Sequence, residues 1–327
     1  MQWTRRELLK AGMCGGVSIF LPPALALSDD LIQRKIPSSG ESLPVIGIGT
    51  ARRYERVTTE AERAPLKEVL RRFEEMGGKV IDTAPSYGTA ETVVGDLVAE
   101  LNIRRSLFIA TKVGAHGRDA GIAEMEQSFK RLHTPTIDLI AVHNLQDTQT
   151  QLRTLRQWKQ AGRIRYVGIT TSFERQHAEF EQTMKAEALD FVQVDYALDN
   201  RKAGERILPL AADRGIGVMI NLPFGRGRLF AAVQGKSLPP WAGDFDCSSW
   251  AQFFLKYIIS HPAVTCALPG TAKVEYLVDN LGAARGRLPD PAMRRRMESF
   301  IDGLKGAVVT SGQDRAFPSG LGPGGGT

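Results

Sequence analysis

The sequence predicts an α/β fold, a single closed (β/α)8 barrel of the TIM type, and three observations support this prediction. Eight short runs rich in Val, Ile or Leu recur along the chain, as is typical of parallel strands buried on both faces. Segments with a helical spacing of apolar residues lie between these runs. Glycines such as Gly162 and Gly215 stand between a helical segment and the next run. Eight strict alternations within 327 residues indicate one barrel.

The elements follow in order from these patterns. The expected strands are residues 45–48, 79–81, 107–110, 137–142, 166–169, 191–194, 218–220 and 264–268. The expected helices are residues 65–76, 91–101, 122–132, 151–161, 175–186, 204–214, 250–260 and 274–283, with a further helix at 290–304 outside the barrel. In the first helix, Leu66, Val69, Leu70 and Phe73 form one apolar stripe.

The main alternative to a barrel is an open doubly wound sheet. Such a sheet carries a glycine-rich turn after its first strand, and the turn at Gly47 and Gly49 lacks the third glycine. The longest irregular connection, residues 223–248, follows the seventh strand, and loops at that end of a barrel usually cover ligands.

The first 26 residues have the layout of an export signal. Arg5 and Arg6 precede an apolar run at residues 11–21, which is too short to cross a bilayer, and residues 24–26 resemble a cleavage site. This order is similar to a twin-arginine signal; a Sec signal, or an amphipathic helix with a chance arginine pair, is the alternative. We therefore expect a periplasmic protein that begins near Leu27 and has no stable membrane span after cleavage.

The remaining chain divides into three parts. A polar N-terminal segment at residues 27–42 precedes the barrel with its C-terminal helix, residues 43–304, and a Gly/Pro-rich tail at residues 305–327 is expected to be disordered. The formal net charge is +6, and no Lys/Arg cluster is interleaved with aromatic residues, so nucleic acid is not an expected partner. A monomer is the expected state, although nothing in the sequence fixes it.

Cysteine usage argues against a metal centre. No group of Cys and His has the spacing of metal ligands. Cys14 lies in the expected signal, which leaves Cys247 and Cys266 in the mature chain. These two can pair in an oxidising compartment, but two unpaired thiols are the simpler interpretation.

Four polar residues gather where the predicted strands end, and this is where barrel enzymes place their reactive groups. Asp82 ends the second strand, Lys112 the third and His143 the fourth, while Tyr87 follows Asp82 in the next loop. Taken singly, each residue has a structural explanation. Asp82 can cap a helix, Lys112 can form an ion pair, His143 can be a hydrogen-bonded core residue and Tyr87 can cover apolar surface. On three successive strands facing one mouth, they predict a reaction centre.

These residue types suit the protonation of a developing alkoxide. A free tyrosine has a pKa near 10 and is a poor acid–base group until its surroundings shift that pKa. A lysine ammonium stabilises the phenolate, and a carboxylate keeps the ammonium charged and oriented. A neutral imidazole can donate a hydrogen bond to a carbonyl oxygen.

The same residues belong to a longer pattern that resembles the aldo-keto reductase family. The resemblance runs from about residue 43 to residue 283. Its motifs, in chain order, are Gly47-x-Gly49-Thr50, Gly78-x-x-x-Asp82-Thr83-Ala84-x-x-Tyr87-Gly88-x-x-Glu91, Thr111-Lys112, Val142-His143-Asn144, Gly162-Arg163-Ile164-Arg165-Tyr166-Val167-Gly168, Gln193 and Pro269-Gly270-Thr271.

The resemblance implies an NAD(P)H-dependent oxidoreductase that reduces a small aldehyde or ketone. Tyr87 would be the general acid, Asp82 and Lys112 would tune it, and His143 would place the substrate oxygen. Gln193 matches the position that holds the nicotinamide carboxamide. The residues that the resemblance places at the cofactor are Gly49, Thr50, Asp82, Thr170, Gln193, Asn221, Gly270, Thr271, Lys273, Asp279 and Asn280. Those from Gly270 onward would lie at the adenosine end of the cofactor.

The sequence departs from the family pattern around the nicotinamide. Many members have Ser-Asn after the fifth strand, where this chain has Thr170 and Thr171. Many have a stacking aromatic at the end of the seventh strand, where Asn221 stands here, so stacking is lost or taken over by Phe224.

The adenosine end also departs from the pattern. Gly270 and Tyr276 stand where some members place basic residues against the 2′-phosphate; Lys273, or Arg226 or Arg228 in the long loop, can replace them. NADP is therefore favoured by family habit, and NAD remains open.

Two classes of function fit these observations. The first is the reductase; the second is a nucleotide-holding regulatory or binding protein with lost or weak turnover, which the altered nicotinamide contacts suggest. A pure binding protein has no need for Tyr87 and Lys112 together, so the reductase is preferred. The substrate is not readable, although Arg52 and Arg53 after the first strand would suit an acidic one unless they are merely solvated.

Overall fold

The computed structural model describes the chain from residue 30 to residue 313, with side chains up to residue 304. The expected export signal at residues 1–26 and residues 314–327 of the expected tail lie outside the described residues, so both expectations stay predictions.

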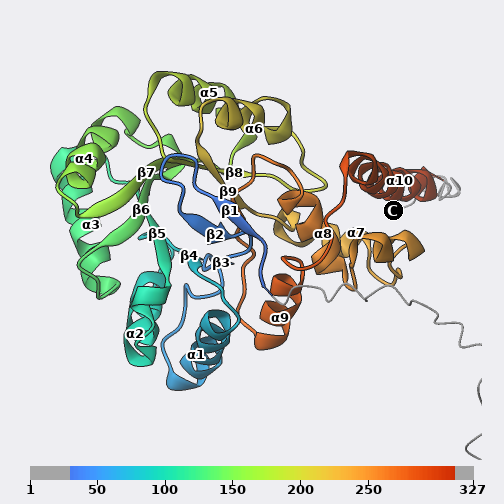
Figure 1. Ribbon diagram of the computed structural model, residues 1–327, viewed down its shortest axis with the longest axis horizontal. Helices are drawn as coiled ribbons and strands as arrows, with labels where there is room; N and C mark the ends of the chain where they lie inside the picture. The colour runs from blue at the N-terminus through green and yellow to red at the C-terminus, as the bar shows by residue number, and fades with distance from the viewer. Residues whose placement is uncertain (1–29, 314–327) are drawn as a thin grey trace, which may run out of the picture.

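Eight parallel strands form a closed ring, which confirms the predicted (β/α)8 barrel (Figure 1). Each strand pairs with the next one along the chain, and bridges from Ile46 to Ala267 and from Gly49 to Gly270 join the last strand to the first. The strands are β3 (Ile48–Gly49), β4 (Val80–Asp82), β5 (Phe108–Val113), β6 (Ile137–Val142), β7 (Ile164–Thr170), β8 (Phe191–Asp195), β9 (Gly217–Asn221) and β10 (Cys266–Ala267).

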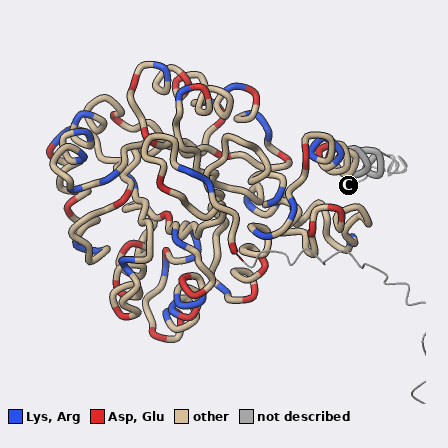
Figure 2. Tube along the Cα trace, in the orientation of Figure 1, with Lys and Arg blue, Asp and Glu red and all other residues tan. Residues whose placement is uncertain are grey.

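Helices surround this ring because each has one apolar face to bury against the strands. They are α1 (Glu60–Glu75), α2 (Ala90–Leu101), α3 (Arg118–Arg131), α4 (Thr148–Gln160), α5 (His177–Ala186), α6 (Ala203–Asp213), α7 (Arg228–Ala232), α8 (Trp250–Ile259), α9 (Val274–Gly282) and α10 (Pro291–Gln313). The predicted apolar stripe of α1 is buried. Lys and Arg alternate with Asp and Glu over the outer helices (Figure 2).

Three differences from the sequence-based expectation have a clear structural basis. Helix α1 begins at Glu60 rather than at Pro65, because Thr59 and Glu62 form a capping box. The connection after β9 is partly ordered, since it contains α7 and the 3₁₀ turns Gly225–Gly227 and Pro240–Phe245. Helix α10 extends past Leu304 to Gln313.

Neither a disulfide nor a membrane span is found in the described part of the chain. Cys247 and Cys266 are both buried free thiols, in agreement with the simpler interpretation. Between residues 30 and 313, none of the helices combines the length and the apolar character that crossing a bilayer needs. Nor do three potential metal ligands of the His, Cys, Asp or Glu type come together within that range.

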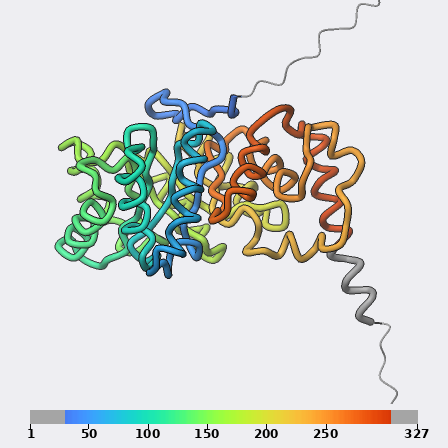
Figure 3. The backbone as a smooth tube through the Cα atoms, turned by 90° about the horizontal axis from the view of Figure 1, so that it is seen from below, coloured from blue at the N-terminus to red at the C-terminus, as the bar shows by residue number. Residues whose placement is uncertain are grey.

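A β-hairpin closes the N-terminal end of the barrel, where only a polar segment was expected. Strands β1 (Gln33–Lys35) and β2 (Ser42–Pro44) pair antiparallel across this end, as the blue segment of Figure 3 shows. Ile36 and Leu43 are fully buried in the inner core of the barrel, in one cluster with Phe108, Tyr166 and Phe191. The hairpin therefore plugs the ring at the end opposite to the C-terminal ends of the strands.

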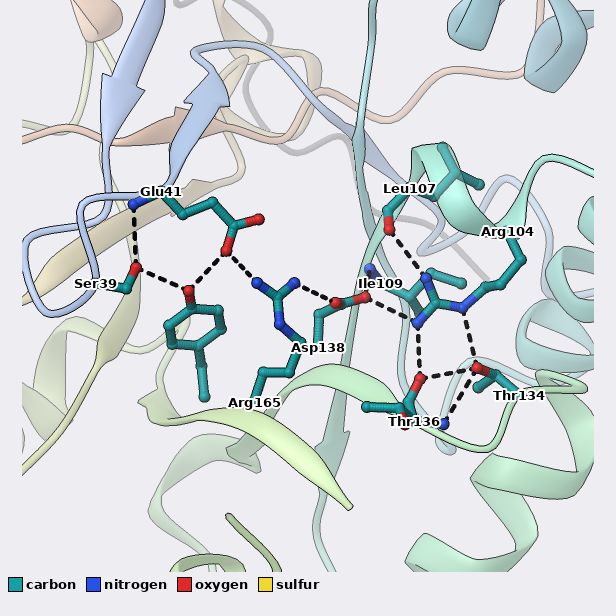
Figure 4. A network of polar contacts seen from close by, with 10 residues as sticks. Ser39, Glu41, Arg104, Leu107, Ile109, Thr134, Thr136, Asp138 and Arg165 are labelled. Carbon is teal, nitrogen blue, oxygen red and sulfur yellow. Dashed lines mark hydrogen bonds and ion pairs between the residues drawn. The ribbon is translucent and has the colours of Figure 1, made fainter. Parts of the chain in front are cut away.

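A polar network fastens this plug to the strands (Figure 4). Glu41 of the hairpin pairs with Arg165 of β7 and accepts a hydrogen bond of 2.7 Å from the Tyr166 hydroxyl. Arg165 also donates to Asp138 of β6 at 2.7 Å, and Arg104 donates to the second oxygen of Asp138 at 2.9 Å. The Ile109 N–H adds a further bond to Asp138 at 2.8 Å. The buried Asp138 carboxylate is thus fully compensated.

We predict that Asp138→Ala lowers the free energy of unfolding by about 3 kcal/mol, because it removes the carboxylate that two arginines share and leaves the buried Ile109 N–H without its acceptor. Urea denaturation followed by circular dichroism measures the change. Glu126→Ala is the control, because its ion pair with Arg163 is exposed and is worth less than about 1 kcal/mol. Equal effects of the two substitutions would show that the network does not stabilise the fold.

Candidate active site

A cavity of about 610 Å³ opens at the C-terminal ends of the strands. Its lining brings together Asp82 and Tyr87, from the end of β4 and the loop after it, with His143, which follows β6. Lys112 of β5, the strand between them, is bonded to Asp82 but is not part of the lining. The cofactor candidates Gly49, Asp82, Asn221 and Gly270 also line this cavity.

Asp82 and Lys112 form a buried ion pair between β4 and β5. The Lys112 ammonium donates to both oxygens of the Asp82 carboxylate at 2.9 Å and to the Thr83 carbonyl at 2.8 Å. Burial lowers the pKa of Lys112, but the Asp82 carboxylate and the neighbouring Tyr87 outweigh it, so the pKa of Lys112 is raised. Lys112 therefore stays an ammonium in its buried position.

The Tyr87 ring stands over this ammonium, with its centroid 5.1 Å from Lys112 Nζ. Burial raises the pKa of Tyr87, and the charge of Lys112 opposes this shift without overcoming it. The expected lowering by Lys112 is thus present, but the net direction is the reverse, because desolvation of the phenolate is the larger effect. Tyr87 remains a protonated hydroxyl, ready to donate.

His143 lies against the edge of Tyr87, with ring centroids 6.0 Å apart and planes at 81°. Its Nδ1 is 3.5 Å from the Ser86 hydroxyl oxygen. Burial, together with the charge of Lys112, lowers the pKa of His143 to about 3. The imidazole is therefore neutral, as expected from the sequence.

The loop that carries Tyr87 packs tightly against the loop after β3. Gly88 has φ +52°, and a Cβ atom there would lie 2.2 Å from the Glu55 carbonyl oxygen, so only glycine allows the approach. Glu91 is buried and accepts hydrogen bonds from Thr111 at 2.6 Å and from Arg131 at 3.0 Å. These two members of the signature hold α2 and the Tyr87 loop in place.

Two amides, Asn221 in the cavity lining and Gln193 in β8 outside that lining, have unused hydrogen-bonding atoms. Gln193 of β8 is 4% exposed, and its Nε2 finds no partner among the described residues. Asn221 at the end of β9 donates its Nδ2 to the Thr171 carbonyl at 3.2 Å, while its buried Oδ1 stays without a partner in the same part of the chain. An uncompensated buried polar atom is costly, so each is a candidate contact for a bound group.

The remaining cofactor candidates lie in different surroundings. Thr50, Thr170, Thr271 and Asn280 are buried, and the Asn280 amide donates to the Thr271 hydroxyl at 3.1 Å. The Thr50 N–H and hydroxyl both donate to the Asp82 carbonyl at 3.0 Å.

Two candidates at the adenosine end stand apart from the cavity lining. The Asp279 carboxylate accepts hydrogen bonds from Ser249 at 2.8 Å and Gln252 at 2.9 Å, at the start of α8. The Lys273 side chain is 60% exposed, with its ammonium 5.5 Å from the Tyr276 ring centroid.

Further residues at the cavity were not predicted from the sequence as site residues. Asn144, Ser172 and Phe230 line the cavity. Ser172 and Arg226 also border a smaller adjoining pocket of about 210 Å³, together with Asp195 and Arg228. Ser172 could have been predicted, because it directly follows Thr171 just after the end of a strand.

Comparisons with known proteins agree with this geometry. A model of the aldo/keto reductase family matches residues 45–300. The uncharacterized oxidoreductase YqkF of Bacillus subtilis is 26% identical over 298 residues, which cover 78% of this chain and 92% of YqkF. The uncharacterized oxidoreductase C215.11c of Schizosaccharomyces pombe is 30% identical over 230 residues, covering 66% of this chain and 72% of that protein.

Two solved structures from Klebsiella pneumoniae are also similar. An aldo/keto reductase in complex with NADP and acetate is 26% identical with a TM-score of 0.68, covering 80% of this chain and 93% of its own. An aldo-keto reductase in complex with NADPH is 25% identical with a TM-score of 0.70, covering 83% of this chain and 95% of its own.

We predict that the His143 ring does not titrate between about pH 5 and pH 8, whereas an unperturbed imidazole with a pKa near 6.5 loses its proton in that window. Because the pKa of His143 is lowered to about 3, the ring stays neutral throughout. Imidazole chemical shifts in a pH series of NMR spectra measure this, with the His143→Asn spectrum assigning the signal. A titration midpoint near pH 6.5 would show that burial does not lower the pKa of His143.

Proposed function

The chain belongs to the aldo/keto reductase family, and we propose that it reduces an aldehyde or ketone to an alcohol with NADPH, using Tyr87 as the proton donor. One observation carries this proposal: a protonated Tyr87 stands beside the buried Asp82–Lys112 pair and a neutral His143 at the mouth of one cavity.

The residues present fit a nicotinamide. A carboxamide has one carbonyl acceptor and one amino donor, and these complement the unused donor of Gln193 and the unused acceptor of Asn221. Thr171 cannot supply an amide, but its carbonyl orients Asn221, which can take over that task from the neighbouring strand end. NADPH is the proposed form because relatives of the same fold bind NADP or NADPH.

The chain's own residues account for the proton in the reaction. NADPH supplies the hydride when it is bound. The His143 ring N–H and the Tyr87 hydroxyl can both donate to the carbonyl oxygen, which gains negative charge as the carbon is reduced. Tyr87 then gives up its proton to that oxygen, and the Lys112 ammonium stabilises the tyrosinate that remains. Asp82 keeps Lys112 charged and fixed throughout.

We further propose that the protein is exported to the periplasm by the twin-arginine route. The proposal is supported by the Arg5–Arg6 pair, the apolar run and the small residues that follow it. Fractionation of a bacterium that produces the chain tests it: a full-length cytoplasmic product, unchanged when both arginines are replaced by lysine, would refute export by this route.

We predict that Tyr87→Phe lowers kcat for NADPH-dependent carbonyl reduction by about a thousandfold, because no other group at the site can deliver the proton as efficiently. NADPH binding, followed by fluorescence titration, is expected to persist. Tyr166→Phe is the matched control, because it removes a tyrosine hydroxyl at the closed end of the barrel. Nucleotide binding without any carbonyl turnover in the wild type would instead support the regulatory alternative.

Gln193→Ala and Asn221→Ala are each expected to raise the Kd of NADPH roughly tenfold, because each removes one hydrogen bond to the carboxamide. Isothermal titration calorimetry measures the Kd directly. Gln160→Ala, the same kind of change on the exposed surface of α4, is expected to leave the Kd unchanged. Unaltered binding in both site variants would remove these residues from the nicotinamide site.

A further inference from the structure

A tight turn after β3 carries two arginines to the cavity. Arg52 and Arg53 both line it, and both lie in a turn in which the N–H groups of Arg53 and Tyr54 donate to the Thr50 carbonyl at 3.1 Å. Arg52 has φ +60°, a left-handed conformation that is unusual for an arginine. The Tyr54 ring behind it is fully buried in the core. The turn is therefore anchored, although its guanidinium groups are solvent-accessible.

The turn is fixed relative to the reaction centre. At one end, Thr50 is held by two hydrogen bonds to the carbonyl of Asp82, the residue that binds Lys112. At the other end, the Thr89 hydroxyl donates to the Tyr54 carbonyl at 2.8 Å, and the Thr89 N–H donates to the Glu55 carbonyl at 3.1 Å. Thr89 lies two residues after Tyr87, so the arginine turn and the Tyr87 loop pack directly against each other.

The charges around the cavity favour an anion. The lining contains Arg52, Arg53 and Arg226 against the carboxylates of Glu55 and Asp82, and Lys112 already neutralises Asp82. Among the side chains described up to residue 304, none forms an ion pair or hydrogen bond with the guanidinium group of Arg52 or Arg53. Arg226 also borders the smaller pocket beside Arg228, whereas the Arg52–Arg53 turn borders only the larger cavity.

We propose that the substrate is an aldehyde or ketone that also carries a carboxylate, and that the Arg52–Arg53 turn binds this carboxylate while the carbonyl lies at Tyr87 and His143. The inference rests on the reductase function proposed above. A guanidinium matches a carboxylate in a planar, two-pronged geometry that a point charge does not offer. The apolar body of such a substrate can pack on Phe224 and Phe230, which also line the cavity with ring centroids 4.9 Å apart.

The test compares 4-carboxybenzaldehyde with its methyl ester, which keeps the ring and the aldehyde but removes the charge. For the wild type with saturating NADPH, kcat/KM is expected to be about tenfold higher for the acid than for the ester. The preference should shrink as salt is added, because the guanidinium groups are exposed. In Arg52→Ala and in Arg53→Ala, the loss of kcat/KM for the acid should exceed any change for the ester by a similar factor.

Arg56→Ala is the matched control, because Arg56 is an exposed arginine on the same segment that does not line the cavity. It is expected to keep the preference for the acid. Titration with NADPH alone separates the two anions that an arginine here can bind. A raised Kd of NADPH with an intact preference for the acid would mean that the turn holds the cofactor, and the inference would be wrong.

Two further outcomes are distinguishable. If the wild type reduces both compounds equally well, the substrate inference fails while the proposed reductase function stands. If it reduces neither compound nor any neutral aldehyde, although NADPH binds, the proposed function fails and this inference fails with it.

Discussion

The buried ion pair between Asp82 and Lys112 is the interaction on which the rest of the site depends. Two charges removed from water are stable only when every hydrogen-bonding atom is satisfied, and here both carboxylate oxygens and the Thr83 carbonyl meet the ammonium. The pair sets the electrostatics around Tyr87 through its side chains. The backbone carbonyl of the same Asp82 also holds the turn that starts at Thr50 and carries Arg52 and Arg53 to the cavity. Parallel pairing of β4 with β5 makes both roles compatible, since adjacent strand ends point to the same mouth.

Most of the fold could be predicted from the sequence, because buried parallel strands appear in it as continuous apolar runs and the outer helices as apolar residues at helical spacing. The N-terminal hairpin could not. Its first strand reads Gln33–Lys35, a polar stretch, and its buried residues Ile36 and Leu43 are too isolated to form a periodic pattern. Its stability comes from contacts with residues more than a hundred positions away, such as Tyr166. The early start of α1 was readable, since Thr59 and Glu62 have the spacing of a capping box.

The candidate site was predictable to the extent that strand ends share one edge. The four predicted residues do lie together, three in the lining of one cavity and Lys112 bonded to one of them, but their electrostatic balance depends on burial, which a sequence does not supply. That is why the expected effect of Lys112 on Tyr87 had the right sign and yet did not decide the net pKa. Hydrogen-bond partners are equally hidden. Nothing in the sequence revealed that Ser249 and Gln252 donate hydrogen bonds to the Asp279 carboxylate. Nor did it reveal that Gln193 and Asn221 each have one buried polar atom without a hydrogen-bond partner within the described chain.

The plug formed by β1 and β2 has a practical consequence for how the protein can be handled. Because residues 30–44 lie at the sealed end of the barrel, a surface linkage placed at the exposed Asp30 holds the molecule with its cavity facing the solution. Diffusion of small molecules to the mouth is then unobstructed by the support. The bonds of that end through Glu41, Arg165 and Asp138 also transmit a pulling force to strands β6 and β7 rather than to the loops around Tyr87. An immobilised form can therefore be built from this end without redesigning the reactive face.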